Sequence, residues 1–149
     1  MITSTEDGVI VTPLLDAFNV PAISAYERQD AAVPPGLRRL GAALALHGIA
    51  MNGGLVGGAV ESLFFNGRMH AVDDAVEGYR WLGLTDVADL ILRVREEYLR
   101  FRPTGWEELS PEDERLWSEL DSAFFELAAD DRLEAAITAR LPQIDPGRG

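Results

Sequence analysis

The chain has 149 residues, of which 47% are hydrophobic, and its 25 acidic residues outnumber its 13 basic residues to give a formal net charge of −12. This length is typical of one compact domain, and the absence of cysteine excludes disulfide bonds, thiolate zinc sites and a cysteine nucleophile. The acidic balance disfavours direct binding to nucleic acid, because phosphates repel a negative surface.

The sequence predicts neither an export signal nor a membrane-spanning segment. Glu6 and Asp7 stand where an export signal would carry basic residues and then an apolar stretch. Residues 40–60 carry no formal charge, but His47 and the turn signal at 52–54 favour two buried helices that meet at a turn. We therefore expect a cytoplasmic protein that makes no membrane contact.

The N-terminal segment, residues 1–35, carries the weakest pattern. Residues 9–11 form a candidate strand with no evident pairing mate. Thr12 and Pro13 predict the start of a helix, because proline is favoured in the first turn, and Pro21 predicts its end.

Two helices in close contact are predicted next. After the break at 34–36, a first helix ends at 52–54, and a second helix then ends at Asn66-Gly67. Their apolar stripes are Leu37, Leu40, Leu44, His47, Gly48 and Met51, and then Leu55, Val56, Ala59, Val60, Leu63 and Phe64. Gly54 and Gly58, four residues apart, allow another backbone to approach closely.

Two more helices precede the acidic part of the chain. The first ends at Leu82-Gly83-Leu84, where glycine can adopt the left-handed conformation, and Thr85 is expected to cap the second. Their apolar stripes are Val72, Ala75, Val76, Tyr79 and Leu82, and then Val87, Leu90, Ile91, Val94, Tyr98 and Phe101. The solvent side of the second helix carries two pairs of opposite charge four residues apart: Arg93 with Glu97, and Glu96 with Arg100.

Residues 107–134 are the most acidic part of the chain. They hold eleven carboxylates and two arginines, so their net charge of −9 is three quarters of the total. Ser110 and Pro111 predict the start of a helix with acids in its first turn, where the helix dipole favours them. A helical wheel over 112–130 gathers the apolar residues on one broad face, whereas Phe125 points away from it and could contact a second subunit or a partner.

The C-terminal part is predicted to hold one short helix over residues 133–141, followed by a loose tail over 142–149. Trp106, in the loop before the acidic helix, is expected to be the most exposed of the three tryptophans. Taken together, the helical periodicity predicts an all-α fold, a single-domain bundle of six to seven helices over residues 1–149.

The carboxylates of the acidic part are the candidate partner-binding residues: Glu107, Glu108, Glu112, Glu114, Glu119, Asp121, Glu126, Asp130 and Asp131. Glu126 and Asp130 are like charges four residues apart, which is unfavourable on a helix, and no arginines interleave to relieve them. Residues three or four apart on a helix rise about 5 to 6 Å, comparable with one or two steps of roughly 3.4 Å along a nucleic-acid strand. A row of carboxylates can thus imitate a row of phosphates. A solvated helix face, or an acidic bias shared by all proteins of the host, is the alternative explanation.

Motifs for catalysis or metal binding are absent or incomplete. His47 lies on an apolar stripe and His70 near a turn, so both are expected as ordinary packed histidines and no metal site is predicted. The glycine run at 53–58 lacks the lysine of a phosphate-binding loop and follows a helix. We predict no catalytic residues, no cofactor and no enzyme activity; a small enzyme with a buried carboxylate pair is an open alternative.

The middle of the chain resembles a known family. Residues 51–54, followed by the Phe-Phe-Asn-Gly element at 64–67 and by residues 78–86, resemble the bacterial DNA mimic protein 19 family over roughly residues 36–102. The interval between Gly54 and Phe64 is longer than the family pattern. The resemblance implies an all-helical fold, no catalytic activity and, in the namesake member, a surface that competes with DNA for a DNA-binding protein. The matched residues are typical fold determinants, so they do not transfer that function.

The leading hypothesis is a non-enzymatic, cytoplasmic protein whose acidic face docks on the basic surface of a DNA- or RNA-binding protein and excludes nucleic acid, without binding nucleic acid itself. The alternative is an immunity or antitoxin-like protein that neutralises a nuclease or other toxin, which shares the physics and differs in the partner. A homodimer is left open.

Overall fold

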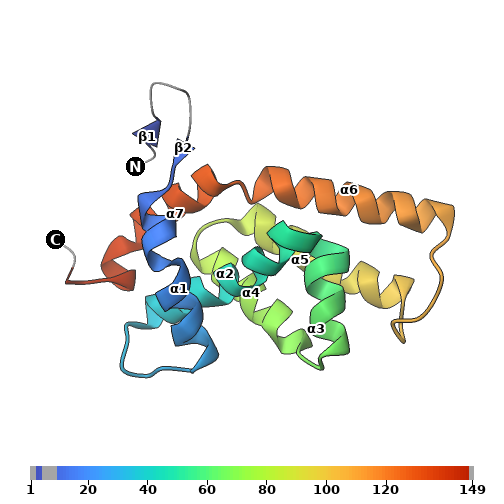
Figure 1. The fold of residues 1–149 in the computed structure, drawn as a ribbon, viewed down its shortest axis with the longest axis horizontal. Coiled ribbons are helices and arrows are strands. Elements are labelled where there is room, and N and C mark those ends of the chain that lie inside the picture. Colours follow the sequence, from blue (N-terminus) through green and yellow to red (C-terminus); the bar gives the residue numbers. More distant parts are fainter. Residues whose placement is uncertain (1–2, 5–9, 148–149) are drawn as a thin grey trace.

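The computed structural model describes residues 3–4 and 10–147, and within these the chain folds almost entirely into helices (Figure 1). The elements in chain order are β1 (Thr3–Ser4), β2 (Ile10–Val11), α1 (Pro13–Glu27), α2 (Pro35–Gly53), the π-helical segment η1 (Leu55–Val60), α3 (Glu61–Phe65), α4 (Met69–Trp81), α5 (Thr85–Phe101), α6 (Pro111–Leu127) and α7 (Asp130–Ile144). The predicted all-α class is therefore confirmed. β1 and β2 form one short antiparallel pair, which gives the candidate strand its mate; Val9 lies outside the described residues.

Helix α2 is the centre of the core, with α1 and α4 packed on it. Leu40 and Leu44 are fully buried, and Gly41 lets α1 approach so closely that a Cβ there would lie 1.9 Å from the carbonyl oxygen of Ala22. Gly48 and Met51, predicted on the buried stripe, are exposed. The stripe is wrong at this end because the C-terminal half of α2 buries Leu46 and Ala50 instead.

Helix α1 runs through Pro21, so the predicted end of this helix is wrong, and 15 residues of the N-terminal segment with the weakest pattern form an ordered helix. Proline lacks the N–H that would bond to the carbonyl of Ala17. That loss is offset by packing, because Phe18, Ala22 and Tyr26 on the following turns are all buried.

The chain bends by 116° between α2 and the segment Leu55–Phe65. The bend begins at Gly54, which has a φ of +93°, a backbone conformation that favours glycine. Gly58 then lies against Gly53 of the same turn, where a Cβ would approach the carbonyl carbon to 2.5 Å. Gly54, the other glycine of the predicted pair, lies against the Asp121 side chain instead of against another backbone. Within the described part of the chain, no single helix has both the length and the apolar character needed to cross a membrane.

The turn between α4 and α5 closes as the sequence predicts. Gly83 has a φ of +82° and donates its N–H to the Arg80 carbonyl, while the Leu84 N–H bonds to the Tyr79 carbonyl, as in a Schellman motif. Thr85, however, is the first residue of α5 and does not cap it; Leu84 takes the cap position and has no side-chain acceptor. The cap prediction is wrong because α5 begins one residue earlier than expected, at Thr85 itself.

Helices α6 and α7 are separate, as predicted, but their boundaries differ from the predicted ones. α6 ends at Leu127 and α7 begins at Asp130, so Glu126 and Asp130 do not sit four apart on one helix. α7 also continues through Pro142 to Ile144, which is buried, so the segment expected as a loose tail from 142 starts as helix. Burial of Ile144 holds this last turn in place.

Candidate acidic interaction surface

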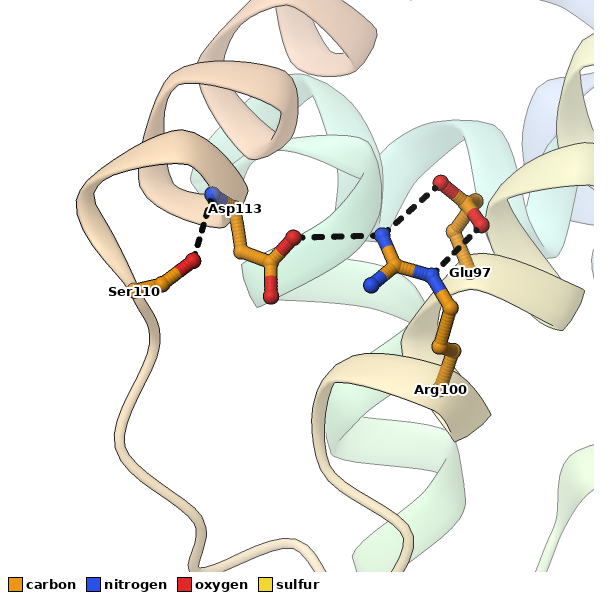
Figure 2. Close-up of polar contacts among 4 residues, drawn as sticks. All are labelled: Glu97, Arg100, Ser110 and Asp113. Atoms are coloured by element: carbon orange, nitrogen blue, oxygen red, sulfur yellow. Dashed lines mark hydrogen bonds and ion pairs between the residues drawn. The ribbon is translucent and has the colours of Figure 1, made fainter.

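The first turn of α6 is fixed to the end of α5 by a polar network (Figure 2). The Ser110 hydroxyl oxygen accepts the Asp113 N–H at 3.1 Å, which confirms the predicted N-cap. The Asp113 carboxylate in turn binds Arg100 at 3.2 Å. Arg100 Nε also lies 3.0 Å from the carboxylate of Glu97, three residues earlier on α5, so Arg100 pairs with Glu97 instead of with the predicted Glu96. The bonds from Arg100 lower the pKa of Glu97 below its ordinary value.

The inner face of α6 is apolar and contacts α5 and η1. Leu120 and Phe124 are buried, and the half-buried Trp117 stacks on Phe101 with ring centroids 5.9 Å apart. The guanidinium of Arg102 lies over the outer side of Trp117 at 5.2 Å. These contacts hold α6 along one edge of the molecule, parallel to its long axis (Figure 1).

The outer side of α6 and the residue run before it expose five carboxylates, which we call the acidic ridge: Glu108, Glu112, Glu114, Glu119 and Glu126. Among the residues that the structure describes, no arginine forms an ion pair with any of the five. The chain's ion-paired arginines bind other acids. Arg115 is exposed on the same helix and lines one surface hollow with Glu119 and Glu126, so the five acids and this arginine leave the ridge with a net negative charge.

Three members of the ridge are spaced by seven residues: Glu112, Glu119 and Glu126. Seven residues rise about 10.5 Å along a helix and drift only about 20° around it, so the three carboxylates share one stripe. This interval is close to three phosphate steps of about 3.4 Å along a nucleic-acid strand.

The remaining predicted site residues have contacts within the chain. Glu107 accepts the Thr104 hydroxyl at 2.6 Å and the Thr104 N–H at 3.0 Å, and these bonds lower its pKa. Asp131 accepts the N–H of the next residue at 2.9 Å, and Asp130 lies 3.6 Å from His47 Nε2 while remaining exposed. Both aspartates occupy the first turn of α7, where the helix dipole favours them.

Asp121 points into the protein. Its carboxylate accepts the Val56 N–H at 2.7 Å and so caps η1, and it lies against the backbone at Gly54. Burial raises the pKa of Asp121 above its ordinary value. Of the nine predicted partner-binding residues, this one is placed where a docked partner cannot readily reach its oxygens.

Glu134, which the sequence pattern counts only as part of the acidic segment, is fully buried. Its two carboxylate oxygens accept the N–H groups of Leu14 and Leu15, at 3.1 and 2.8 Å, and so cap α1. Thr12, at the cap position, makes no such bond with its own side chain. The sequence carries one weak signal for this role, since Glu134 occupies a position between apolar neighbours on α7.

Exposed aromatic rings border the ridge. Trp106 is 81% exposed, as expected, and lies edge-on to Phe65 at 5.1 Å. Phe125 is 42% exposed on α6, so it does point away from the core. The exposure of Phe65 was not predicted, because its neighbour Phe64 carries the apolar pattern.

A hollow of about 650 Å³ is open to solvent and lies between α1, α2 and α4, away from the ridge. Its two carboxylates already bind side chains of this chain: Asp74 accepts the Tyr26 hydroxyl at 2.6 Å, and Glu77 pairs with Arg80 at 2.9 Å. Among the described residues no three potential ligands gather to hold a metal ion.

The two histidines lie apart. His47 is buried, with Nδ1 lying 3.1 Å from the Tyr79 hydroxyl, as expected of a packed histidine. His70 is exposed at the start of α4.

Comparison with known proteins gives one match. A family model described as DMP19-like protein matches residues 31–140, a span that includes α2 to α6 and most of α7. No curated protein and no solved structure matches the chain.

Proposed function

The chain belongs to the DMP19-like protein family, and we propose that it is a non-enzymatic binding module whose acidic ridge occupies the basic surface of a nucleic-acid-binding protein. The matched span extends the resemblance from residues 36–102 to 31–140 and so takes in the ridge. Family membership supports the fold and leaves the partner open. The proposal about the partner rests on charge.

One observation carries the proposal: five exposed carboxylates stand on and before a well-anchored helix, and none of the arginines in the described part of the chain is paired to them. Clustered like charges oppose folding through mutual repulsion. In the same molecule Arg95, Arg102 and Arg132 each bind an acid elsewhere, at 2.7 to 2.8 Å. Arginines of this chain thus pair with acids outside the ridge, and we expect the ridge to bind a cationic partner.

The partner's surface is expected to be one that contacts phosphates. The stripe of Glu112, Glu119 and Glu126 repeats at about 10.5 Å, a spacing that arginines and lysines arranged along a nucleic-acid strand can meet. Association would be fast and sensitive to salt, because the field of the ridge steers a cationic partner towards it. The ridge would repel nucleic acid itself.

The test is affinity capture from nuclease-treated host lysate with the full chain as bait. We expect the wild type to retain a DNA- or RNA-binding protein and the double variant Glu119→Arg/Glu126→Arg to lose it. The matched control is Glu27→Arg/Glu77→Arg, which changes the net charge equally on α1 and α4 and should retain the partner.

Undiminished capture by Glu119→Arg/Glu126→Arg would contradict the proposal. Retention of a nuclease or another toxin, released by the same variant, would assign the ridge to neutralisation of that toxin instead.

A further inference from the structure

A pair of exposed aromatic rings lies beside the acidic ridge without an intramolecular cover. Trp106 is 81% exposed and Phe65 46% exposed, and the two rings meet edge to face at 5.1 Å. Exposed tryptophan is costly in water, and it is among the side chains that contribute most to binding at protein interfaces.

The loop that presents Trp106 is fixed by its own contacts. Gly105 has a φ of +91° and lies so close to Phe65 that a Cβ would approach Cζ of that ring to 2.5 Å. The Gly105 N–H donates to the Arg102 carbonyl at 2.9 Å, and Glu107 binds both the N–H and the hydroxyl of Thr104. The backbone that carries Trp106 is therefore fixed before any partner arrives, which reduces the entropy cost of binding.

Exposure alternates along residues 105–110, where every second side chain faces solvent. Gly105 is buried and Glu107 and Leu109 are half-buried, whereas Trp106 and Glu108 are exposed. Such alternation places Trp106 and Glu108 on the same, outer side of the segment. The indole and the first carboxylate of the ridge thus form one continuous surface that leads into α6.

We propose that Trp106 and Glu108 together bind an arginine side chain of the protein partner, an inference that rests on the proposed function. A planar guanidinium can lie over an indole face and donate hydrogen bonds to a carboxylate beside it. The chain uses the first of these contacts internally, since Arg102 lies over Trp117 at 5.2 Å. Glu108 would repel a phosphate, and a second copy of this chain would bring a further acidic ridge into contact, so a cationic partner fits best.

The test uses defined probes: fluorescein-labelled hexa-arginine and hexa-lysine peptides, titrated with the full chain at low salt and followed by fluorescence anisotropy. Trp106→Ala should weaken binding of hexa-arginine about fivefold, the equivalent of roughly 1 kcal/mol, and should weaken hexa-lysine less, because arginine stacks better on indole. The control Val20→Ala removes another strongly exposed apolar side chain, on α1, and should leave both affinities within about twofold. Because Trp106 is largely exposed, the variant should keep the thermal unfolding midpoint of the wild type.

Three outcomes would overturn the inference. In the first, Trp106→Ala binds hexa-arginine like the wild type, and in the second it loses affinity for both peptides equally. In the third, light scattering shows that the wild type is a dimer and Trp106→Ala a monomer, which would make the aromatic pair a subunit interface. The variant Glu119→Arg/Glu126→Arg separates the two proposals. If it loses the peptides while Trp106→Ala does not, only the role of the indole fails, and if it binds them like the wild type, the proposed function fails.

Discussion

Replacing Glu134 with glutamine is expected to destabilise the fold while leaving the acidic ridge intact. Glu134 is fully buried on α7, and its two oxygens accept the N–H groups of Leu14 and Leu15 in the first turn of α1. Glutamine has the same shape, but its amide nitrogen cannot accept a hydrogen bond. One of the two buried N–H groups would lose its acceptor.

The magnitude follows from two contributions. A buried donor left without a partner costs about 1–3 kcal/mol, and removal of a negative charge from a helix N-terminus costs a further 0.3 to about 2 kcal/mol. We therefore expect Glu134→Gln to lower the free energy of unfolding by about 2–4 kcal/mol at neutral pH. Each kcal/mol corresponds to a fall of about 2–4 °C in Tm for a domain of this size.

Urea unfolding followed by circular dichroism measures this loss, with Glu126→Gln as the matched control. Glu126 is exposed and forms no ion pair with the described residues, so its replacement should change the free energy by no more than about 0.5 kcal/mol. Hydrogen exchange adds a local readout, because the amides of α1 should lose protection in Glu134→Gln. Equal stability of the two variants would refute the capping role of Glu134.

Three further predictions concern stability. Gly41→Ala should lower the free energy of unfolding in urea by about 3 kcal/mol or more, because its Cβ would meet the Ala22 carbonyl at 1.9 Å. Gly48→Ala on the same helix has open space around its Cβ and should raise this free energy by up to about 1 kcal/mol. Similar effects of the two variants would contradict the packing of α1 on α2. Ser110→Ala should cost about 0.5–2 kcal/mol in the same assay, because α6 loses its cap, and an unchanged midpoint would count against that cap. Burial lowers the pKa of His47, despite the attraction of Asp130, so below pH 6.5 the unfolded chain binds a proton that the folded chain does not. The free energy of unfolding of the wild type should then decrease as the pH is lowered, by at most about 1.4 kcal/mol per pH unit. His47→Gln should flatten this dependence between pH 7 and 5.5, and parallel slopes for the two proteins would refute the role of His47.

Features that depend on neighbouring residues were predicted well from the sequence. The Ser110 cap, the turn at 82–84 and the apolar stripe of α5 each depend on interactions within one or two helical turns. The helical wheel also predicted correctly that the acidic side of α6, opposite its broad apolar face, lies in solvent. Local propensity and periodicity were enough for these elements.

Features that depend on distant partners were not predictable in this way. Pro21 reads locally as a helix end, but α1 continues because its next turns pack on α2. In the sequence, Asp121 and Glu134 are simply members of one acidic segment. In the structure, Asp121 caps η1 at a residue 65 positions away, and Glu134 caps α1 at a residue 120 positions away. A single sequence does not show which residues of two distant segments lie next to each other, so the capping roles of Asp121 and Glu134 could be found only from the structure.

The acidic segment therefore serves two purposes in this account. Asp121 and Glu134 hold η1 and α1 against the C-terminal helices, and Asp113 joins α6 to α5. The five carboxylates of the ridge are exposed and form no ion pair with an arginine within residues 3–4 and 10–147. This division explains how one segment can be strongly acidic and well folded at the same time.

Competition between the chain and nucleic acid for the captured partner shows whether the ridge occupies the nucleic-acid site. A labelled nucleic-acid duplex bound to that partner is titrated with the wild-type chain or with Glu119→Arg/Glu126→Arg, and fluorescence anisotropy reports the duplex released. The account predicts that the wild type displaces the duplex, with an efficiency that falls as salt rises, and that the double variant does not. Binding of the wild-type chain to the partner without release of the duplex would contradict the claim that the ridge occupies the nucleic-acid site.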